Sequence, residues 1–184
     1  EPNRTLVHAQ EMVDEALELA NIEMRRRNVR LTHFVAARIP PVMADAILIE
    51  QVLINLIKNA GESIDQAQRP PAQRSVELRV QPKDNEGLAG VEFSVKDSGK
   101  GLPPEVQDRL FEAFFSTKNE GMGIGLNLCR SIVESHHGRM SAENLYNGSE
   151  VVGCRFFFWI PLAAAQEKGD NFSSAINPNT RKSA

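Results

Sequence analysis

The chain has 184 residues, a formal net charge of −3 at pH 7, 41% hydrophobic residues and 24% charged residues. This balance is typical of a globular domain with its own core, and the small negative charge does not support nucleic-acid binding. Because the apolar runs are too short to cross a membrane and no secretory signal is visible, we expect a cytoplasmic domain. Upstream segments could still anchor the full-length protein to a membrane.

The first half of the chain alternates between helical and extended patterns. Apolar residues at helical spacing predict a helix over 7–27, and β-branched residues predict a strand over 29–35. Asp45 is a good N-cap for a helix over 46–65. Alternating apolar residues then predict strands over 76–80 and 91–95, joined as a hairpin by a polar turn over 82–90.

The second half has shorter elements and a polar end. Two consecutive prolines can start a short helix over 105–110, and a second helix is predicted over 124–137, with Gly138 ending it as a C-cap residue. Strands are predicted over 140–144 and 154–160, around a loop over 146–153. Residues 165–184 are polar and are predicted to form a disordered tail. The two cysteines, Cys129 and Cys154, are predicted to be buried thiols, not a disulfide or a metal pair.

Two asparagines stand out in the helix predicted over 46–65. Asn55 and Asn59 are four residues apart, so their side chains share one face of the helix. Asparagine is a mediocre helix former, because its side chain competes for backbone hydrogen bonds. The pair could be a polar edge that caps neighbouring loops, or two amides at a metal–phosphate site, since an amide oxygen suits Mg²⁺.

A stretch over 95–128 carries three further motifs: D-S-G-K-G, F-E-A-F-F-S-T-K and G-M-G-I-G-L. Asp97 ends an apolar strand pattern, where its carboxylate can accept hydrogen bonds from an amino group. A glycine loop that opens a helix suits phosphate, and Lys118 adds a positive charge before it. Taken singly, D-x-G-x-G is also compatible with an ordinary turn. The phenylalanines between the glycine motifs could pack in the core or anchor a mobile lid.

Taken together and in this order, the motifs resemble the N box, first glycine box, F box and second glycine box of the ATP-binding catalytic domain of bacterial sensor histidine kinases. The short gap between the F box and the second glycine box resembles the FixL-type subgroup. The resemblance covers about residues 7–162. It implies the Bergerat (GHKL) fold over 7–164, an α/β two-layer sandwich with helices packed on one face of a mixed sheet. Residues 1–6 are then expected to be a linker from a dimerisation and phosphoacceptor domain.

The resemblance also implies a role for each motif residue. Asp97 would bond the adenine amino group, and Gly99 and Gly101 would shape the adenine pocket. Asn59 would coordinate Mg²⁺, with Asn55 in support. The residues expected around the phosphates of ATP are Thr117, Lys118, Gly121, Gly123 and Gly125. Leu126 is also expected to contact the nucleotide. Asn55, Thr117 and Lys118 are expected to be catalytic.

One position bears on the reaction. In the related gyrase, chaperone and mismatch-repair ATPases, a glutamate four residues before the metal-binding asparagine activates water. Asn55 occupies that position here, and an amide cannot act as a general base at neutral pH. The site is therefore expected to hold ATP without rapid hydrolysis and to deliver the γ-phosphate to a protein nucleophile, mainly by positioning and charge stabilisation.

The phosphoacceptor is not expected within this chain. None of the four histidines, His8, His33, His136 and His137, is followed by an acidic residue, and all are interpreted as structural or surface residues. The acceptor would be a histidine on the dimerisation domain of the same kinase, which would be a homodimer at full length and would feed a response regulator. This piece alone is expected to be a monomer.

Two other classes stay open from the sequence. A Bergerat-fold ATPase that gates a conformational change is opposed by Asn55 in place of glutamate. The other class is a pure binding protein, such as an anti-sigma-factor switch kinase that acts on serine. The helix pattern over 7–27 favours the sensor kinase, because it resembles the element just after a dimerisation domain.

Overall fold

The computed structural model describes residues 1–107, 109 and 122–167. The helices within these ranges are α1 (Ala9–Arg26), α2 (Ala46–Gln66), the 3₁₀ turn η1 (Pro71–Gln73), α3 (Pro104–Gln107) and α4 (Met122–Ser135). The strands are β1 (Thr5–Val7), β2 (Arg30–Val35), β3 (Val42–Ala44), β4 (Ser75–Asn85), β5 (Leu88–Asp97), β6 (Arg139–Asn147) and β7 (Glu150–Pro161).

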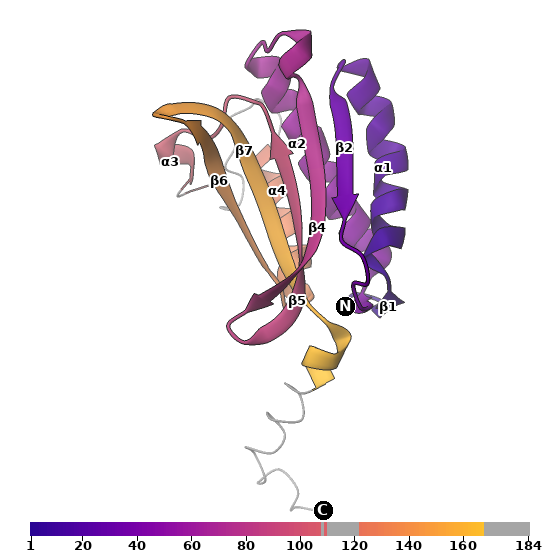
Figure 1. The fold of residues 1–184 in the computed structure, drawn as a ribbon. Coiled ribbons are helices and arrows are strands. Elements are labelled where there is room, and N and C mark those ends of the chain that lie inside the picture. The colour runs from indigo at the N-terminus through magenta and orange to yellow at the C-terminus, as the bar shows by residue number, and fades with distance from the viewer. Residues whose placement is uncertain (108, 110–121, 168–184) are drawn as a thin grey trace, which may run out of the picture.

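In the part of the chain that the structure describes, five strands form one mixed sheet in the order β2-β4-β5-β7-β6, and β1 pairs with β3 in a second, two-stranded sheet. β2 and β4 run parallel, whereas β4, β5, β7 and β6 are joined by antiparallel pairs. Figure 1 shows α2 and α4 behind the large sheet and α1 beside β2. The expected two-layer architecture, with helices on one face of a mixed sheet, is confirmed.

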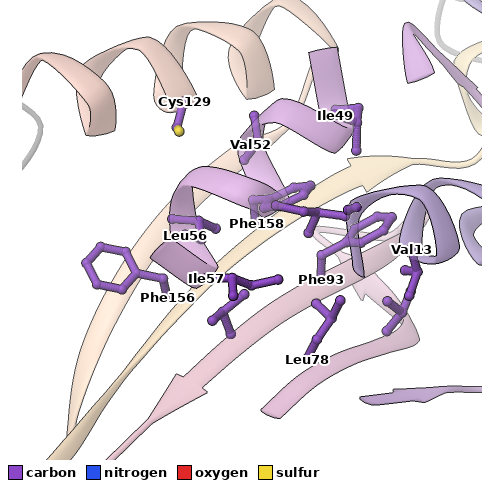
Figure 2. Close-up of a cluster of buried hydrophobic side chains, with 14 of the residues drawn as sticks. Val13, Ile49, Val52, Leu56, Ile57, Leu78, Phe93, Cys129, Phe156 and Phe158 are labelled. Carbon is purple, nitrogen blue, oxygen red and sulfur yellow. The ribbon is translucent and has the colours of Figure 1, made fainter. Parts of the chain in front are cut away.

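The core lies between the helices and the inner face of the sheet (Figure 2). Leu78, Phe93 and Phe158 come from three neighbouring strands and are fully buried. The rings of Phe93 and Phe158 stack with centroids 4.8 Å apart. Because strand side chains alternate between faces, the same strands present charged residues such as Arg79 and Lys96 on the other side of the sheet. The period-2 patterns of the sequence therefore identified the correct buried face.

Two connections are shorter than predicted. The polar turn predicted over 82–90 is wrong in extent, because β4 and β5 pair as far as Asn85 and Leu88. The turn itself is Glu86 and Gly87, both with positive φ (50° and 83°), as in two-residue hairpins that match the twist of the strands. The loop predicted over 146–153 likewise reduces to a tight turn, in which Gly148 has a φ of 64°.

The predicted C-cap of α4 is also wrong in its detail. His137, and not Gly138, adopts the left-handed conformation, with a φ of 61°. The N–H of Gly138 still closes the helix by donating to the Val133 carbonyl at 3.0 Å. A Cβ at position 138 would lie 2.1 Å from the backbone oxygen of Trp159. Glycine is therefore needed here because β7 passes so close, and not because of its φ.

The ordered fold extends beyond both predicted boundaries. Thr5–Val7 pair with β3, and the Asn3 N–H donates to the Asp45 carboxylate at 2.9 Å, so residues 1–6 are not simply a linker. Three-residue strands are too short to give a clear alternation, which is why this pair escaped prediction. At the other end, a helical turn over 163–167 includes the first residues of the predicted tail. The rest of that tail lies outside the described residues.

The histidines have structural or surface positions, as predicted. His136 is fully buried; its Nδ1 lies 2.7 Å from the Ile132 carbonyl and its Nε2 accepts the Asp45 N–H at 2.9 Å. This link joins the end of α4 to the start of α2. His8, His33 and His137 are exposed. Both cysteines are buried free thiols, which confirms the prediction, and no helix in the described ranges is long and apolar enough to span a membrane.

Candidate functional site

Helix α2 presents a polar face in an otherwise apolar helix. It begins at Asp45, whose side chain caps the helix by accepting the Leu48 N–H at 3.3 Å. Asn55, Asn59 and Ser63 follow at four-residue spacing and so lie on one face, over a length of about 12 Å. The Asn59 side chain, which is half-buried, has no hydrogen-bond partner among the described residues. Its amide is therefore available to a ligand.

Two contacts fix how α4 lies against α2. The Asn55 Nδ2 donates to the Cys129 Sγ at 3.7 Å, and Figure 2 shows Cys129 on α4 above the buried face of α2. Burial raises the pKa of the Cys129 thiol to about 11, so this thiol stays protonated at neutral pH. The second contact is the His136 link to Asp45. Together they show that α4 runs antiparallel to α2, which brings the first turn of α4 level with Asn59.

That first turn contains two residues predicted to wrap phosphate. Gly123 and Gly125 lie within the first four residues of α4, and a Cβ at Gly125 would meet no atom within 4 Å. The N–H groups at a helix start have no partner within the helix and attract anions. Leu126, by contrast, is 1% exposed and belongs to the core, so its predicted nucleotide contact stays a prediction.

Asp97 lies at the end of β5 and is 4% exposed. Its Oδ1 accepts the Gly99 N–H at 2.7 Å. Burial raises the pKa of this carboxyl to about 7, against backbone hydrogen bonds from Gly99 and Cys154 that favour the charged form. Asp97 has no ion pair with any described residue. A buried carboxyl without a cation is typical of a site that binds a ligand.

The loop after Asp97 rests directly on α2. A Cβ at Gly99 would lie 2.2 Å from the Ser63 Oγ, so only glycine allows this approach. The Lys100 N–H lies 3.3 Å from the same hydroxyl. Gly101 has a φ of 73°, and a Cβ there would lie 2.3 Å from the Val151 side chain. The loop after Asp97 therefore contacts Ser63 on the same face of α2 that carries the two asparagines.

Three residues of this site were not identified from the sequence. Ser63 could have been found, because it continues the four-residue spacing of the asparagines. Arg69 donates to the carbonyls of Ser98 and Gly99 at 2.8 and 3.1 Å. Asn144 donates to the Leu102 carbonyl and accepts the Leu102 N–H, both at 2.7 Å. Arg69 and Asn144 come from distant segments, and no local pattern marks them.

The remaining predicted residues, Thr117, Lys118 and Gly121, lie outside the described residues. The phenylalanines of the F box also lie outside them, as does most of the lid predicted over 119–122. The described site thus contains the carboxylate, the two amides and the start of the glycine-rich helix.

The donor set also bears on a metal ion. The described residues include no group of three His, Cys, Asp or Glu side chains that could hold one. Mg²⁺ is usually held by one or two protein oxygens and by substrate phosphates. The amide oxygens of Asn59 and Asn55 fit this pattern, because neither oxygen has a hydrogen-bond donor among the described residues.

The fold defines an α/β sandwich domain, in which the helix carrying two amides lies close to the loop that follows a central strand. Residues 44–164 match the family described as histidine kinase-, DNA gyrase B-, and HSP90-like ATPase. The chain belongs to this family of ATPase domains, which confirms the resemblance drawn from its four motifs. The expectation of a kinase catalytic domain is confirmed by the similar proteins.

Similar proteins agree with this assignment. The chain is 42% identical over 166 residues to the C4-dicarboxylate transport sensor protein DctS of Rhodobacter capsulatus, covering 90% of this chain and 23% of DctS. It is 38% identical over 152 residues to the sensor protein FixL of Bradyrhizobium diazoefficiens, covering 83% of this chain and 28% of FixL. The structure is similar to the catalytic domain of the histidine kinase ThkA, with a TM-score of 0.68, 31% identity, and coverage of 86% of this chain and 95% of that domain. The chain thus spans about a quarter of the length of these curated relatives.

Proposed function

We propose that this domain binds Mg-ATP and transfers the γ-phosphate to a histidine on a separate dimerisation and phosphoacceptor domain of the same sensor kinase, which then feeds a response regulator. The observation that supports this most is the buried Asp97 carboxylate. It has no cationic partner among the described residues, and the loop that follows it contacts Ser63 on the α2 face that carries Asn59.

The geometry favours one orientation of the nucleotide. The adenine amino group would donate to Asp97, with Gly99 and Gly101 shaping the pocket around the ring. The phosphates would lie between Asn59 and the first turn of α4, where helix N–H groups favour anions. Thr117, Lys118 and Gly121 are proposed to complete this part of the site, with Gly123, Gly125 and Leu126 on the helix side.

Asn59, supported by Asn55, would hold Mg²⁺ through its amide oxygen. When bound, the metal neutralises charge on the phosphates. The protein's own contribution is to fix the nucleotide against α2 and to leave the γ-phosphate open to an incoming side chain. Asn55 donates its amide N–H to Cys129, which holds the side chain in place, and its amide cannot take a proton from water. The site therefore favours transfer over hydrolysis.

The acceptor and the partners are part of the same proposal. Of the four histidines, His136 is committed to two backbone contacts, and His137 contacts the Arg4 guanidinium at 2.9 Å. We infer that the acceptor lies in another domain of the full-length homodimer. The sensor names of DctS and FixL support a response regulator as the final acceptor.

The direct test is to mix the chain with ATP, Mg²⁺ and a separately produced acceptor-helix domain. An acid-labile phosphohistidine on that domain is the expected product. Acid-stable phosphoserine would indicate a serine switch kinase, and rapid phosphate release without transfer would indicate a gating ATPase. Binding alone can be checked by melting, because ATP at about a hundred times its dissociation constant adds about 2.7 kcal/mol, a shift on the order of 5–10 °C. The absence of a shift would contradict the site.

A further inference from the structure

Arg69 lies just after α2 and turns back toward the loop that follows Asp97. The chain leaves the helix through Gln68, which has a φ of 52°, and Pro70 follows directly. Both features restrict the backbone on either side of Arg69. The Arg69 side chain is half-buried, and both of its hydrogen bonds go to backbone carbonyls of residues 98 and 99. It pairs with no carboxylate among the described residues.

The hydrogen bonds form a continuous chain from this guanidinium to the Asp97 carboxylate. The Arg69 Nε donates to the Ser98 carbonyl at 2.8 Å. That carbonyl belongs to the same peptide unit as the Gly99 N–H, which donates to the Asp97 Oδ1 at 2.7 Å. A cation on the carbonyl side of a peptide polarises its N–H, and linked hydrogen bonds strengthen one another in a low-dielectric interior.

The other described groups that face Asp97 offer no such support. From β7 comes Cys154, whose thiol is neutral because burial raises its pKa to about 12, with the negative charges of Asp97 and Glu143 adding to the effect. From α2 comes Ser63, which contacts the loop and carries no charge. Lys96 precedes Asp97 but lies on the opposite face of the sheet, across from Glu77. Among the described residues, Arg69 is thus the cation that hydrogen bonds connect to the carboxylate.

We propose that Arg69 is a positioning residue for adenine recognition, which acts through the Ser98–Gly99 peptide to keep the Asp97 carboxylate charged and correctly oriented for the adenine amino group. It does not itself contact the nucleotide. This inference rests on the proposed binding of adenine at Asp97. It adds the residue that allows the buried carboxylate to accept a hydrogen bond from the adenine amino group near neutral pH.

The test measures the affinity of the 184-residue chain for ADP by calorimetry from pH 6 to pH 9, in wild type, Arg69→Gln and Arg69→Lys. Dividing the variant's dissociation constant by that of wild type at each pH cancels the titration of ADP itself. If the Gln substitution moves the midpoint of the Asp97 titration up by about one pH unit, the ratio is about fivefold at pH 7 and close to one at pH 9. Arg69→Lys keeps the charge with a poorer donor geometry and should lie between the two.

Arg74→Gln is the matched control. Arg74 comes from the same connection and is also partly buried, but it donates to the carbonyls of Arg27 and Asn28 and pairs with Asp65. Its loss should therefore change ADP affinity by a factor that does not depend on pH. A pH-independent ratio for Arg69→Gln would reduce Arg69 to a structural role, and a ratio of one throughout would remove its role altogether; either result overturns the proposal. If Arg69→Gln does not fold, a flat ratio for Arg69→Lys has the same meaning.

A second readout separates this inference from the proposed function. The difference in unfolding free energy between wild type and Arg69→Gln should grow from pH 6 to pH 9, and this growth should vanish when both chains also carry Asp97→Asn. If wild type does not bind ADP at any pH, the proposed function fails, while the stability measurement still decides whether Arg69 and Asp97 are linked. If the difference in unfolding free energy still grows with pH when both chains carry Asp97→Asn, Arg69 and Asp97 are not linked.

Discussion

Replacing Asp97 by asparagine should stabilise the folded domain at neutral and basic pH while removing adenine binding. The cause is the burial of this carboxyl, which raises its pKa from the ordinary 3.8 to about 7. Below about pH 3.8 the folded and unfolded states both hold the proton. Between 3.8 and 7 the unfolded chain releases it and the folded chain retains it, so stability falls as pH rises, and above 7 the loss is complete.

The full effect is about 4 kcal/mol, because each pH unit between the two pKa values corresponds to about 1.4 kcal/mol. Between pH 5 and pH 8, the part due to Asp97 is roughly 2.5 kcal/mol. Asparagine keeps an oxygen that can accept the Gly99 N–H and carries no charge. We therefore expect the stability of Asp97→Asn, relative to wild type, to increase by about 2.5 kcal/mol from pH 5 to pH 8. Urea unfolding at the two pH values measures this directly.

Asp65→Asn is the control with the opposite sign. Burial alone would raise the pKa of Asp65, but hydrogen bonds and charges from Arg74 and Arg27 outweigh it and lower the pKa. The stability that Asp65 contributes is present above its ordinary pKa and is lost only as pH falls below it. The difference between Asp65→Asn and wild type should thus be the same at pH 5 and pH 8. If Asp97→Asn behaves in the same way, the Asp97 carboxylate is not held as described.

Three further predictions address other parts of the domain. His136→Ala should lower the free energy of unfolding by about 2–4 kcal/mol, because it leaves the Asp45 N–H unpaired inside the protein and creates a cavity. The same substitution at the exposed His137 should change the free energy of unfolding by less than about 0.5 kcal/mol. Chemical denaturation of both variants measures the two effects. Gly101→Ala should destabilise the domain and weaken ATP binding, since a methyl group would lie 2.3 Å from the Val151 side chain. Gly87→Ala is the control, because Gly87 has a φ of 83° with open space around it and the substitution should cost only about 1 kcal/mol of backbone strain. Similar losses of stability in the two variants would refute the close approach at Gly101. Removing Mg²⁺ with a chelator should weaken ATP binding to wild type at least tenfold, the equivalent of about 1.4 kcal/mol. The chelator should have little further effect on ATP binding to Asn59→Ala. An equally strong chelator effect on this variant would show that Asn59 does not hold the metal.

Much of this protein could be predicted from local sequence. The hydrophobic periods placed the main helices and the strands of the large sheet, because each must bury one face against the core. The Asp45 cap follows from residue type and position alone. The four motifs in their order were sufficient to recognise the family, since each supplies backbone or side-chain chemistry that a nucleotide requires. The roles of Thr117, Lys118 and Gly121 remain predictions.

Tertiary structure decided the rest, and the reason is sequence distance. Arg69 donates a hydrogen bond to a loop 29 residues further along the chain, and Asn144 accepts one from Leu102, 42 residues away. No local sequence pattern predicts either contact. Gly138 looked like a helix cap, but it is required by the approach of β7. The buried state of Asp97, and with it the raised pKa, arises only when β5, β7 and α2 come together. The sequence by itself therefore determined which chemical groups are present and which elements carry them, whereas the packing of distant segments set how close those groups lie and how strongly each one holds its charge.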